Sequence, residues 1–420
     1  MGQTTLMKAF ERELLSQLAS LREQGLERKL RRIDTPQAPH VLLEGRRLLN
    51  FSSNDYLGLA NHPALKEAAI EAIEKYGAGT GASRLLSGSL APHHHLEEGL
   101  AVFKGAEAAL TFSTGYAAAL GTLGALIGKQ DIVILDKLSH ACLIDAARLS
   151  GAALRVFAHN DLNQLEEKLK WACARNAGAN HNGGVSRPRT LVVTESVFSM
   201  DGDRAPLRQI VELKERYGAW LMVDEAHATG LYGEHRRGVL EELGLSDQVE
   251  IQMGTMGKAI GASGGYICGS RCLIDLLVNR ARSFIFSTAP VPAAAAAAAA
   301  GVCLIQSAVG AERRGVLCRG ISQLESGMNL PSGLKLGPIV PLLIGDEAKA
   351  VRVADALPDR GIFIPAIRYP TVARGSARLR VTVTASHTAG EVEQLLAALQ
   401  NLELIPGSTR IQAHAHASFG

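Results

Sequence analysis

The sequence of 420 residues lacks a strong excess of either charge, and this absence narrows the range of its partners. Its formal net charge is only +3, from 44 basic and 41 acidic side chains. Proteins that bind nucleic acids or membrane surfaces through charge usually carry a much larger basic excess. We therefore expect neither partner, while a local basic patch for a phosphorylated ligand remains compatible with this composition.

Long hydrophobic runs are also missing. The longest apolar run is Val291-Pro292 followed by alanines 293–300, which is too short and too weakly hydrophobic to cross a bilayer. It predicts instead a buried helix with proline in its first turn. The N-terminal segment is amphipathic, contains acidic residues and lacks the apolar core of a secretory signal. We therefore expect a cytoplasmic protein.

Paired metal or disulfide motifs are absent as well. The six cysteines are scattered and include no CxxC pair, so we expect reduced thiols rather than disulfides. Three consecutive histidines, His93 to His95, have no acidic or cysteine partner at the spacing of metal ligands. We expect them to begin a helix, and we expect no metal site.

The sequence does contain a regular alternation of short apolar runs and helical patterns between about residues 62 and 280. The candidate strands are Ala108–Phe112, Asp131–Leu135, Leu154–Phe157, Thr190–Thr194, Trp220–Asp224, Ile251–Met253 and Gly265–Cys268. Strands that alternate with helices form a largely parallel sheet with helices on both faces. The fold class is therefore α/β, in which ligands bind beyond the carboxyl ends of the strands.

The chain is long enough for more than one domain. A helix is expected over residues 8–32, and two later strands, Ile339–Ile344 and Leu379–Val383, alternate with helices in a pattern typical of a small α+β domain. The expected divisions are an N-terminal helical segment at 1–50, a large domain at 51–290, a small domain at 291–405 and a disordered tail at 406–420.

Lys258 lies in the apolar, glycine-containing segment Thr255-Met256-Gly257-Lys258-Ala259, directly after a predicted strand. Burying an ammonium group is costly, and one resolution is a covalent Schiff base, the bond that lysine forms with carbonyl groups. A surface lysine in a loop is the plain alternative, and for this segment alone it is the better one. A phosphate loop of the GxxxxGK[ST] type is excluded because Ala259 follows the lysine.

The segment Leu221-Met222-Val223-Asp224-Glu225-Ala226-His227 adds a second indication. Its strand delivers Asp224 to the carboxyl edge of the sheet, where a carboxylate can pair with a protonated pyridine nitrogen. His227 would then reach the phenolic oxygen of the same ring. The alternative is an ordinary helix cap and a turn residue. A strand that ends in Asp-x-x-His, followed by the lysine, is more specific than either part.

Two further segments could contact a ligand that contains such a ring. Phe112 to Ala118 is a strand, a turn of small residues and the start of an alanine-rich helix, whose free N–H groups and dipole could hold a phosphate. A plain strand-to-helix turn is an equally good interpretation of this segment by itself. His140 could stack on a cofactor ring, although a lone histidine is more often structural.

Together these segments resemble the α-oxoamine synthases, a family of fold-type I enzymes that depend on pyridoxal 5′-phosphate (PLP). The resemblance covers about residues 8–402. Its motifs are FSSNDYLGLA (51–60), GTGASRLLSG (79–88), LSHACLIDA (138–146), ESVFSMDGDRAPL (195–207), VDEAHATGLYGEHRRG (223–238) and TMGKAIGASGGY (255–266). Family members condense a small amino acid with an acyl thioester and release CO₂. The resemblance implies a mainly parallel seven-stranded sheet, a smaller C-terminal domain, and a homodimer with shared active sites.

The resemblance also implies a role for individual residues. Lys258 carries the cofactor as a Schiff base and transfers a proton, Asp224 pairs with the pyridine nitrogen, and His227 pairs with the phenolic oxygen. Ser199 lies in the cofactor pocket and His140 stacks on the ring. The phosphate is held by Gly115, Tyr116 and Thr255, with Ser287 and Thr288 contributed by a second subunit. The residues expected to contact substrate are Arg28, His140, Arg368 and Thr371, with Arg368 as the anchor for the carboxylate of the amino acid.

Three segments, FSSNDYLGL, GTGASRLLSG and residues 365–372, resemble one branch of the family. That branch condenses L-alanine with pimeloyl-CoA or pimeloyl-acyl carrier protein in biotin biosynthesis. Tyr369 and Ala373 stand where the branch usually has prolines. The alternatives within the family are glycine C-acetyltransferase, 5-aminolevulinate synthase and serine palmitoyltransferase. An alternative of another class is an inactive α/β binding subunit, against which the intact Lys258, Asp224 and His227 argue.

Overall fold

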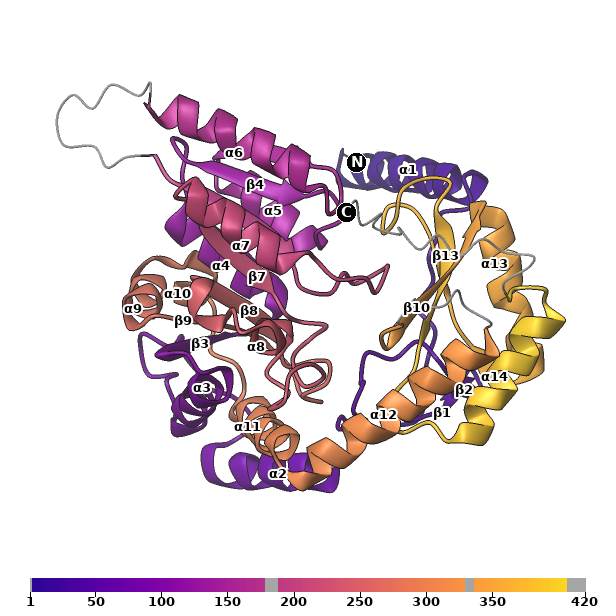
Figure 1. Ribbon diagram of the computed structural model, residues 1–420. Coiled ribbons are helices and arrows are strands. Elements are labelled where there is room, and N and C mark those ends of the chain that lie inside the picture. The colour runs from indigo at the N-terminus through magenta and orange to yellow at the C-terminus, as the bar shows by residue number, and fades with distance from the viewer. Residues whose placement is uncertain (1, 178–187, 329–335, 406–420) are drawn as a thin grey trace. The chain divides into compact units, whose positions relative to one another are not determined.

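The structure, a computed structural model, describes residues 2–177, 188–328 and 336–405 (Figure 1). It divides into two compact units. The larger unit consists of Asn54–Cys318 and Thr384–Ser386, and the smaller unit is drawn from Met1–Ser53, Arg319–Val383 and His387–Gly420. The tail expected at 406–420 lies outside the described residues.

In the described residues, a seven-stranded sheet forms the centre of the larger unit, with the strand order β3-β9-β8-β7-β6-β4-β5. The strands are β3 (Ala108–Phe112), β4 (Ile132–Asp136), β5 (Ala153–Phe157), β6 (Thr190–Glu195), β7 (Trp220–Asp224), β8 (Ile251–Thr255) and β9 (Gly265–Gly269). The neighbours from β8 to β5 pair in parallel, whereas β9 pairs antiparallel with β3 and with β8. The predicted α/β fold class and its mainly parallel sheet are thus confirmed.

Successive side chains of these strands enter two different hydrophobic cores, because side chains alternate across a strand. In β4, Val133 and Leu135 pack into the core that contains α4 (Gly115–Leu126) and α5 (Ala141–Leu149). Ile132 and Ile134 of the same strand pack into the core that contains α6 (Leu162–Ala177) and α7 (Leu207–Arg216). Helices therefore cover both faces of the sheet, which explains why its strands are apolar almost throughout.

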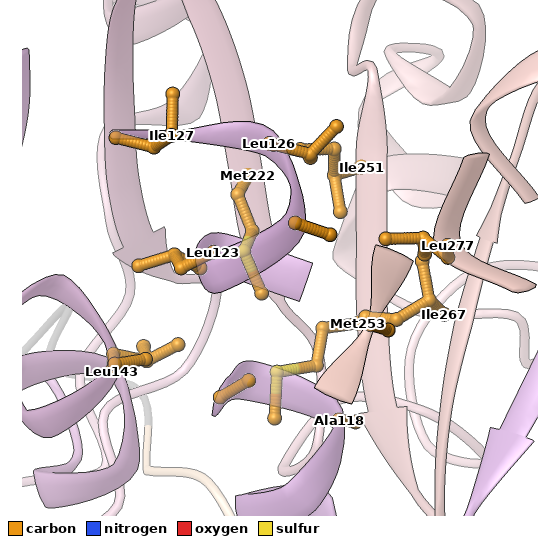
Figure 2. Packing of buried hydrophobic residues seen from close by; sticks show 14 of the residues in the cluster. Ala118, Leu123, Leu126, Ile127, Leu143, Met222, Ile251, Met253, Ile267 and Leu277 are labelled. Atoms are coloured by element: carbon orange, nitrogen blue, oxygen red, sulfur yellow. The ribbon is translucent and has the colours of Figure 1, made fainter. Parts of the chain in front are cut away.

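The core on the α4 face is shown in Figure 2. Leu123 of α4 lies there with Met222 of β7 and Met253 of β8, and all three side chains are at most 1% exposed. These contacts hold α4 against the central strands of the sheet. They thereby place the first turn of α4 near the carboxyl ends of β7 and β8.

The remaining helices of the larger unit are α2 (Pro63–Tyr76), α3 (Ala91–Lys104), α8 (Val239–Leu243), α9 (Arg271–Arg280), α10 (Arg282–Ile285) and α11 (Pro292–Gln306). The alanine-rich run forms α11, which has Pro292 in its first turn and packs against α2 and α3. Ala295 and Ala298 are buried there, so the predicted buried helix is confirmed. Among the described residues no single helix has the length and apolar content of a membrane span, although α11 and α12 (Ala308–Gly327), bent by 73°, pass that test as a pair.

The smaller unit contains two three-stranded sheets in the described residues, with the orders β1-β2-β11 and β10-β13-β12. Its strands are β1 (His40–Leu43), β2 (Arg46–Asn50), β10 (Ile339–Gly345), β11 (Ile362–Phe363), β12 (Ala366–Ile367) and β13 (Ala377–Thr382). Its helices are α1 (Gly2–Glu23), α13 (Glu347–Ala356) and α14 (Ala389–Asn401), and α12 contains the boundary between the units. The N-terminal segment belongs to this unit, and α11 belongs to the larger one. The division at 50/51 and 290/291 remains our proposal for the domains.

The first helix ends earlier than the sequence predicts. The predicted helix covers residues 8–32, but α1 ends at Glu23, so the prediction is wrong beyond that residue. Gly25 adopts a left-handed conformation with φ +66°, and the N–H of Leu26 donates back to the carbonyl of Leu21 at 2.8 Å. A glycine in this conformation is a common end of a helix because it has no Cβ to clash. The basic run from Arg28 to Arg32 therefore follows the helix instead of lying on its face.

Candidate active site

Three polar residues end three neighbouring parallel strands of the large sheet. Glu195 is the last residue of β6, Asp224 of β7 and Thr255 of β8. Glu195 is the register partner of Asp224, and Asp224 is the register partner of Met253, two residues before Thr255. Because parallel strands end at the same edge of a sheet, this edge gathers two carboxyl groups and a hydroxyl where α/β folds bind their ligands.

Asp224 is held in a buried position by the apolar strand that precedes it. Asp224 is 5% exposed, and its Oδ1 accepts a hydrogen bond from the N–H of Ala226 at 2.8 Å. Burial raises the pKa of Asp224, while the positive charge of Lys258 and the Ala226 hydrogen bond act in the opposite direction. A buried carboxyl group with this raised pKa gains stability from any additional cation bound beside it.

Glu195 is a residue of the site whose part the sequence did not indicate. It is 2% exposed, and its carboxylate accepts hydrogen bonds from the backbone N–H of His140, at 2.6 Å, and from that of Ser199. Burial, followed by the negative charge of Asp224, raises the pKa of Glu195 well above its ordinary value. Glu195 therefore joins the segments that carry His140 and Ser199, and its neighbourhood favours a bound cation as well.

Lys258 follows β8 in a turn between the buried residues Met256 and Ala259, and it is itself half-buried. Burial raises the pKa values of Asp224 and Glu195, and the positive charge of Lys258 opposes this rise. Burial lowers the pKa of His140, and the charge of Lys258 lowers it further. The structure thus brings Lys258 into electrostatic contact with the residues at the strand ends. A lysine on an open surface loop, the plain alternative, would not interact with buried carboxyl groups in this way.

His227 lies after β7 in the buried segment that begins at Asp224, and it is 4% exposed. Its Nδ1 is hydrogen-bonded to the hydroxyl of Tyr56 at 2.6 Å. Tyr56 is fully buried and belongs to the motif FSSNDYLGLA, so the motif could have indicated it, although its hydrogen bond could not be inferred from sequence. Tyr56 fixes the orientation of the imidazole.

The first turn of α4 lies against the end of β8. A Cβ added to Gly115 would stand 2.5 Å from Cγ2 of Thr255, so only a glycine fits this approach. Thr114 caps the helix by accepting a hydrogen bond from the N–H of Ala117 at 3.0 Å. The first N–H groups of a helix have no partner within the helix, and they attract anions.

The hydroxyl of Thr255 also indicates an anionic ligand. Its Oγ1 is buried and has no hydrogen-bond partner among the described residues. A buried hydroxyl without a partner is costly, and a phosphate oxygen would supply the missing one. Together with two buried carboxyl groups that favour a cation, this hydroxyl fits a ligand with a phosphate at one end and a protonated ring nitrogen elsewhere, which is the chemistry of PLP.

The close approach of Gly115 to Thr255 makes a testable contribution to cofactor binding. In Gly115→Ala the new methyl group forces apart the first turn of α4 and the end of β8. We expect the affinity for PLP to fall roughly tenfold, about 1.4 kcal/mol, in a titration of the apoprotein followed by absorbance. Gly124→Ala in the same helix is the control, because its Cβ would meet no atom within 4 Å. Equal affinity in Gly115→Ala and the wild type would contradict this arrangement.

The other residues expected near the cofactor lie in the larger unit too. His140 caps the start of α5, where its Nδ1 accepts a hydrogen bond from the N–H of Cys142 at 3.3 Å. The hydroxyl of Tyr116 donates to Asp145 of α5. Ser287 and Thr288 follow α10, and Thr288 forms an isolated bridge with Ser83 of the motif GTGASRLLSG.

Three of the four residues expected to contact substrate lie in the smaller unit, whereas His140 lies in the larger one. Arg28 Nη2 donates to the hydroxyl of Thr371 at 3.4 Å and to the carbonyl of Tyr369 at 3.3 Å. Arg368 Nη2 donates to the carbonyl of Glu27, the residue before Arg28. The structure therefore brings Arg28, Arg368 and Thr371 together within this unit, although Arg28 and Thr371 are more than 300 positions apart.

Glu225, next to Asp224, has a different partner. Its carboxylate lies 2.5 Å from Nζ of Lys104, and the two side chains are at most 1% exposed. Lys104 also donates to the carbonyl of Arg237, and Glu225 accepts from the N–H of Leu240 at 2.9 Å. These hydrogen bonds satisfy both charges, as a buried ion pair requires. Lys104 is thus a buried lysine with a structural partner, a role that the sequence did not indicate.

Comparisons with known proteins agree with this geometry. The model of the aminotransferase class I and II family matches residues 46–399. The 8-amino-7-oxononanoate synthase of Geobacter sulfurreducens is 45% identical over 394 residues, which cover 93% of this chain and 98% of that protein. The same enzyme of Herminiimonas arsenicoxydans is 46% identical over 396 residues, covering 92% and 98%.

Solved structures show the same likeness. Serine palmitoyltransferase of Sphingomonas wittichii has a TM-score of 0.84 and 30% identity, covering 96% of this chain and all of that one. A serine palmitoyltransferase solved with a PLP internal aldimine has the same TM-score, 30% identity, and coverage of 94% and 98%. An 8-amino-7-oxononanoate synthase from Francisella tularensis has a TM-score of 0.69 and 26% identity, covering 85% and 98%. The chain therefore belongs to the PLP-dependent class I and II aminotransferase family and, within it, to the 8-amino-7-oxononanoate synthases.

Proposed function

We infer that the chain catalyses the decarboxylative condensation of L-alanine with a pimeloyl thioester. The products are 8-amino-7-oxononanoate, CO₂ and the free thiol, and the reaction belongs to biotin biosynthesis. The observation that carries this inference is the meeting of Lys258, Asp224 and Thr255 at one sheet edge in a chain that is 45–46% identical to 8-amino-7-oxononanoate synthases.

When bound, PLP supplies an electron sink that takes up the electron pair released as bonds to the amino-acid Cα break. We assign Lys258 Nζ two tasks, namely covalent attachment of the cofactor and removal of the Cα proton of L-alanine. Asp224 holds a proton on the pyridine nitrogen, for which its buried carboxylate and raised pKa suit it. These roles use the charged side chains of Lys258 and Asp224 at the carboxyl ends of the strands.

The other residues orient the reacting groups. His227, fixed by Tyr56, faces the phenolic oxygen, and His140 covers the ring. The hydroxyl of Ser199 lies in the cofactor pocket, on the segment whose backbone is held by Glu195. Thr255 with the first N–H groups of α4, at Gly115 and Tyr116, binds the phosphate.

We assign substrate recognition to the smaller unit's Arg28, Arg368 and Thr371. An arginine can bind the carboxylate of L-alanine through two parallel hydrogen bonds, which suits Arg368 to that task. Arg28 and Thr371, already hydrogen-bonded to each other, are then placed to contact the same substrate. The chain acts as a homodimer in this proposal, with Ser287 and Thr288 supplied to the phosphate by the second subunit. Its acyl carrier is either CoA or a carrier protein.

A product assay separates this function from its relatives. The purified enzyme is incubated with L-alanine, glycine or L-serine, each with pimeloyl-CoA, pimeloyl-acyl carrier protein, acetyl-CoA, succinyl-CoA or palmitoyl-CoA, and the products are identified by mass spectrometry. We expect 8-amino-7-oxononanoate from alanine and a pimeloyl thioester to exceed every other product. Faster turnover of serine with palmitoyl-CoA would instead favour the activity of the serine palmitoyltransferases. Absence of turnover with every pair would favour an inactive binding subunit.

A further inference from the structure

A second group of charged residues lies at the same edge of the sheet, beyond the residues assigned to the cofactor. Asp136 is the last residue of β4, His159 follows the end of β5, and Asp203 lies in the loop after β6. Nδ1 of His159 is 3.0 Å from Oδ1 of Asp136, and its Nε2 is 2.7 Å from Oδ2 of Asp203. The imidazole therefore bridges two carboxylates from different strands.

The geometry requires a protonated imidazole. A carboxylate accepts hydrogen bonds but donates none, so each ring nitrogen that faces one must carry a hydrogen. The titratable groups hydrogen-bonded to His159 include Asp136 from β4 and Asp203 from the loop after β6. Burial lowers the pKa of His159, but the hydrogen bonds to Asp136 and Asp203 outweigh it and raise the pKa to about 10. At neutral pH one cation thus separates two anions.

Asp136 shapes the turn that leads to His140. Its Oδ1 accepts a hydrogen bond from the N–H of Leu138 at 2.8 Å, and its carbonyl accepts one from Ser139 at 3.1 Å. The turn ends at His140, whose own N–H donates to Glu195. The carboxylate of Asp136 is therefore shared between His159 and the turn that presents His140.

Asp203 holds the loop that carries Ser199. The carbonyl of Asp203 accepts from the N–H of Phe198 at 2.9 Å, and Val197 forms a bridge with Arg204 across the loop. The imidazole of His159 also meets the ring of Phe198 edge-on, with the ring centroids 4.3 Å apart. His159 thus contacts this loop twice, on both sides of Ser199.

We propose that His159 is a positioning residue whose imidazolium, held between Asp136 and Asp203, fixes the turn that carries His140 relative to the loop that carries Ser199. Glu195 also joins these two segments, through their backbone N–H groups. The inference rests on the proposed function, because it takes His140 and Ser199 as cofactor contacts. Without the cation, two carboxylates face each other with no charge between them, and both segments lose their common anchor.

Two variants and a control test the inference. His159→Gln keeps a side chain of similar size but cannot donate to both carboxylates. Asp203→Asn removes one of the two negative charges. The side chain of Asp203 is 36% exposed, so we expect this variant to fold even if His159→Gln does not. His95→Gln is the control, since His95 is an exposed histidine on α3, a helix to which none of the three charged residues belongs.

The first readout is the protonation of His159, measured by NMR of the full chain with ¹⁵N-labelled histidine. The signals of His159 are assigned by comparison with His159→Gln or, if that variant does not fold, with Asp203→Asn. We expect its two ring nitrogens to stay protonated between pH 6 and 9 in the wild type. Asp203→Asn should lower the pH at which it titrates. A neutral imidazole at pH 7 in the wild type would overturn the inference.

The second readout is the affinity of the full chain for PLP, which does not depend on the identity of the substrates. We expect the dissociation constant to rise roughly tenfold in Asp203→Asn, and in His159→Gln where it folds, and to stay unchanged in His95→Gln. Unchanged affinity in the folded variants overturns the positioning role. If the wild type binds PLP but makes no product from alanine with either pimeloyl-CoA or pimeloyl-acyl carrier protein, the proposed function fails while these two readouts still decide the role of His159.

Discussion

Lys258→Ala is expected to abolish turnover and to remove the visible absorbance of the bound cofactor. The variant loses both the amine that attaches PLP and the base that takes the Cα proton, and proton transfer by a placed side chain alone contributes up to about 10⁴-fold. The positive charge of this amine acts on the pKa values of both Asp224 and Glu195. We therefore expect a loss of at least ~10⁴-fold in kcat.

A comparison with Lys258→Arg separates the charge of the side chain from its chemistry. Arginine keeps the positive charge near the carboxyl groups, but its guanidinium forms no Schiff base and does not give up a proton at neutral pH. We expect Lys258→Arg to be as inactive as Lys258→Ala, while Lys129→Ala, a change at an exposed lysine, retains full activity. Turnover by either Lys258 variant within tenfold of the wild type would show that another group performs the reaction.

Asp224→Asn is expected to produce the second largest loss. The asparagine amide has nearly the same shape, so the fold of β7 is kept, but it offers no negative charge to a protonated pyridine nitrogen. Removing one partner of a buried charge pair costs about 2–5 kcal/mol, or roughly 30- to 5,000-fold in rate. We expect this loss in kcat, measured at saturating concentrations of both substrates and of PLP.

Two controls accompany Asp224→Asn. Asp275→Asn changes an exposed carboxylate on α9 and should leave kcat unchanged. Thermal unfolding of Asp224→Asn should occur at or above the temperature of the wild-type apoprotein, because burial already disfavours the charged carboxylate there. Retention of wild-type kcat by a folded Asp224→Asn would remove Asp224 from the mechanism.

Much of the fold could be predicted because the parallel strands have a strong local signature. The apolar run that contains Ile132 to Leu135 faces two cores, so each of its residues is hydrophobic, and the predicted strand differs from β4 by one position at each end. Polar residues such as Asp224 at the end of such a run then indicate the ligand edge. Gly25, a residue that commonly ends a helix, lies inside the helix predicted over residues 8–32, and α1 ends just before it.

The rest of the site depends on contacts that no local pattern contains. The hydrogen bond of Tyr56 to His227 joins residues 171 positions apart, and the ion pair of Lys104 with Glu225 joins residues 121 positions apart. Glu195 directly follows the predicted strand Thr190–Thr194, but the sequence did not indicate that its carboxylate holds the backbone of His140. Such partners become visible only when the strand order β8-β7-β6-β4 is known.

The central claim is that Lys258 carries the cofactor at this sheet edge, and borohydride reduction of the holoenzyme tests it most directly. Reduction makes the bond between a lysine and PLP permanent, so proteolysis and mass spectrometry can identify the lysine. We predict a single modified peptide, with the cofactor on Lys258. Modification of another lysine, such as the buried Lys104, or no modification of any peptide, would contradict the account.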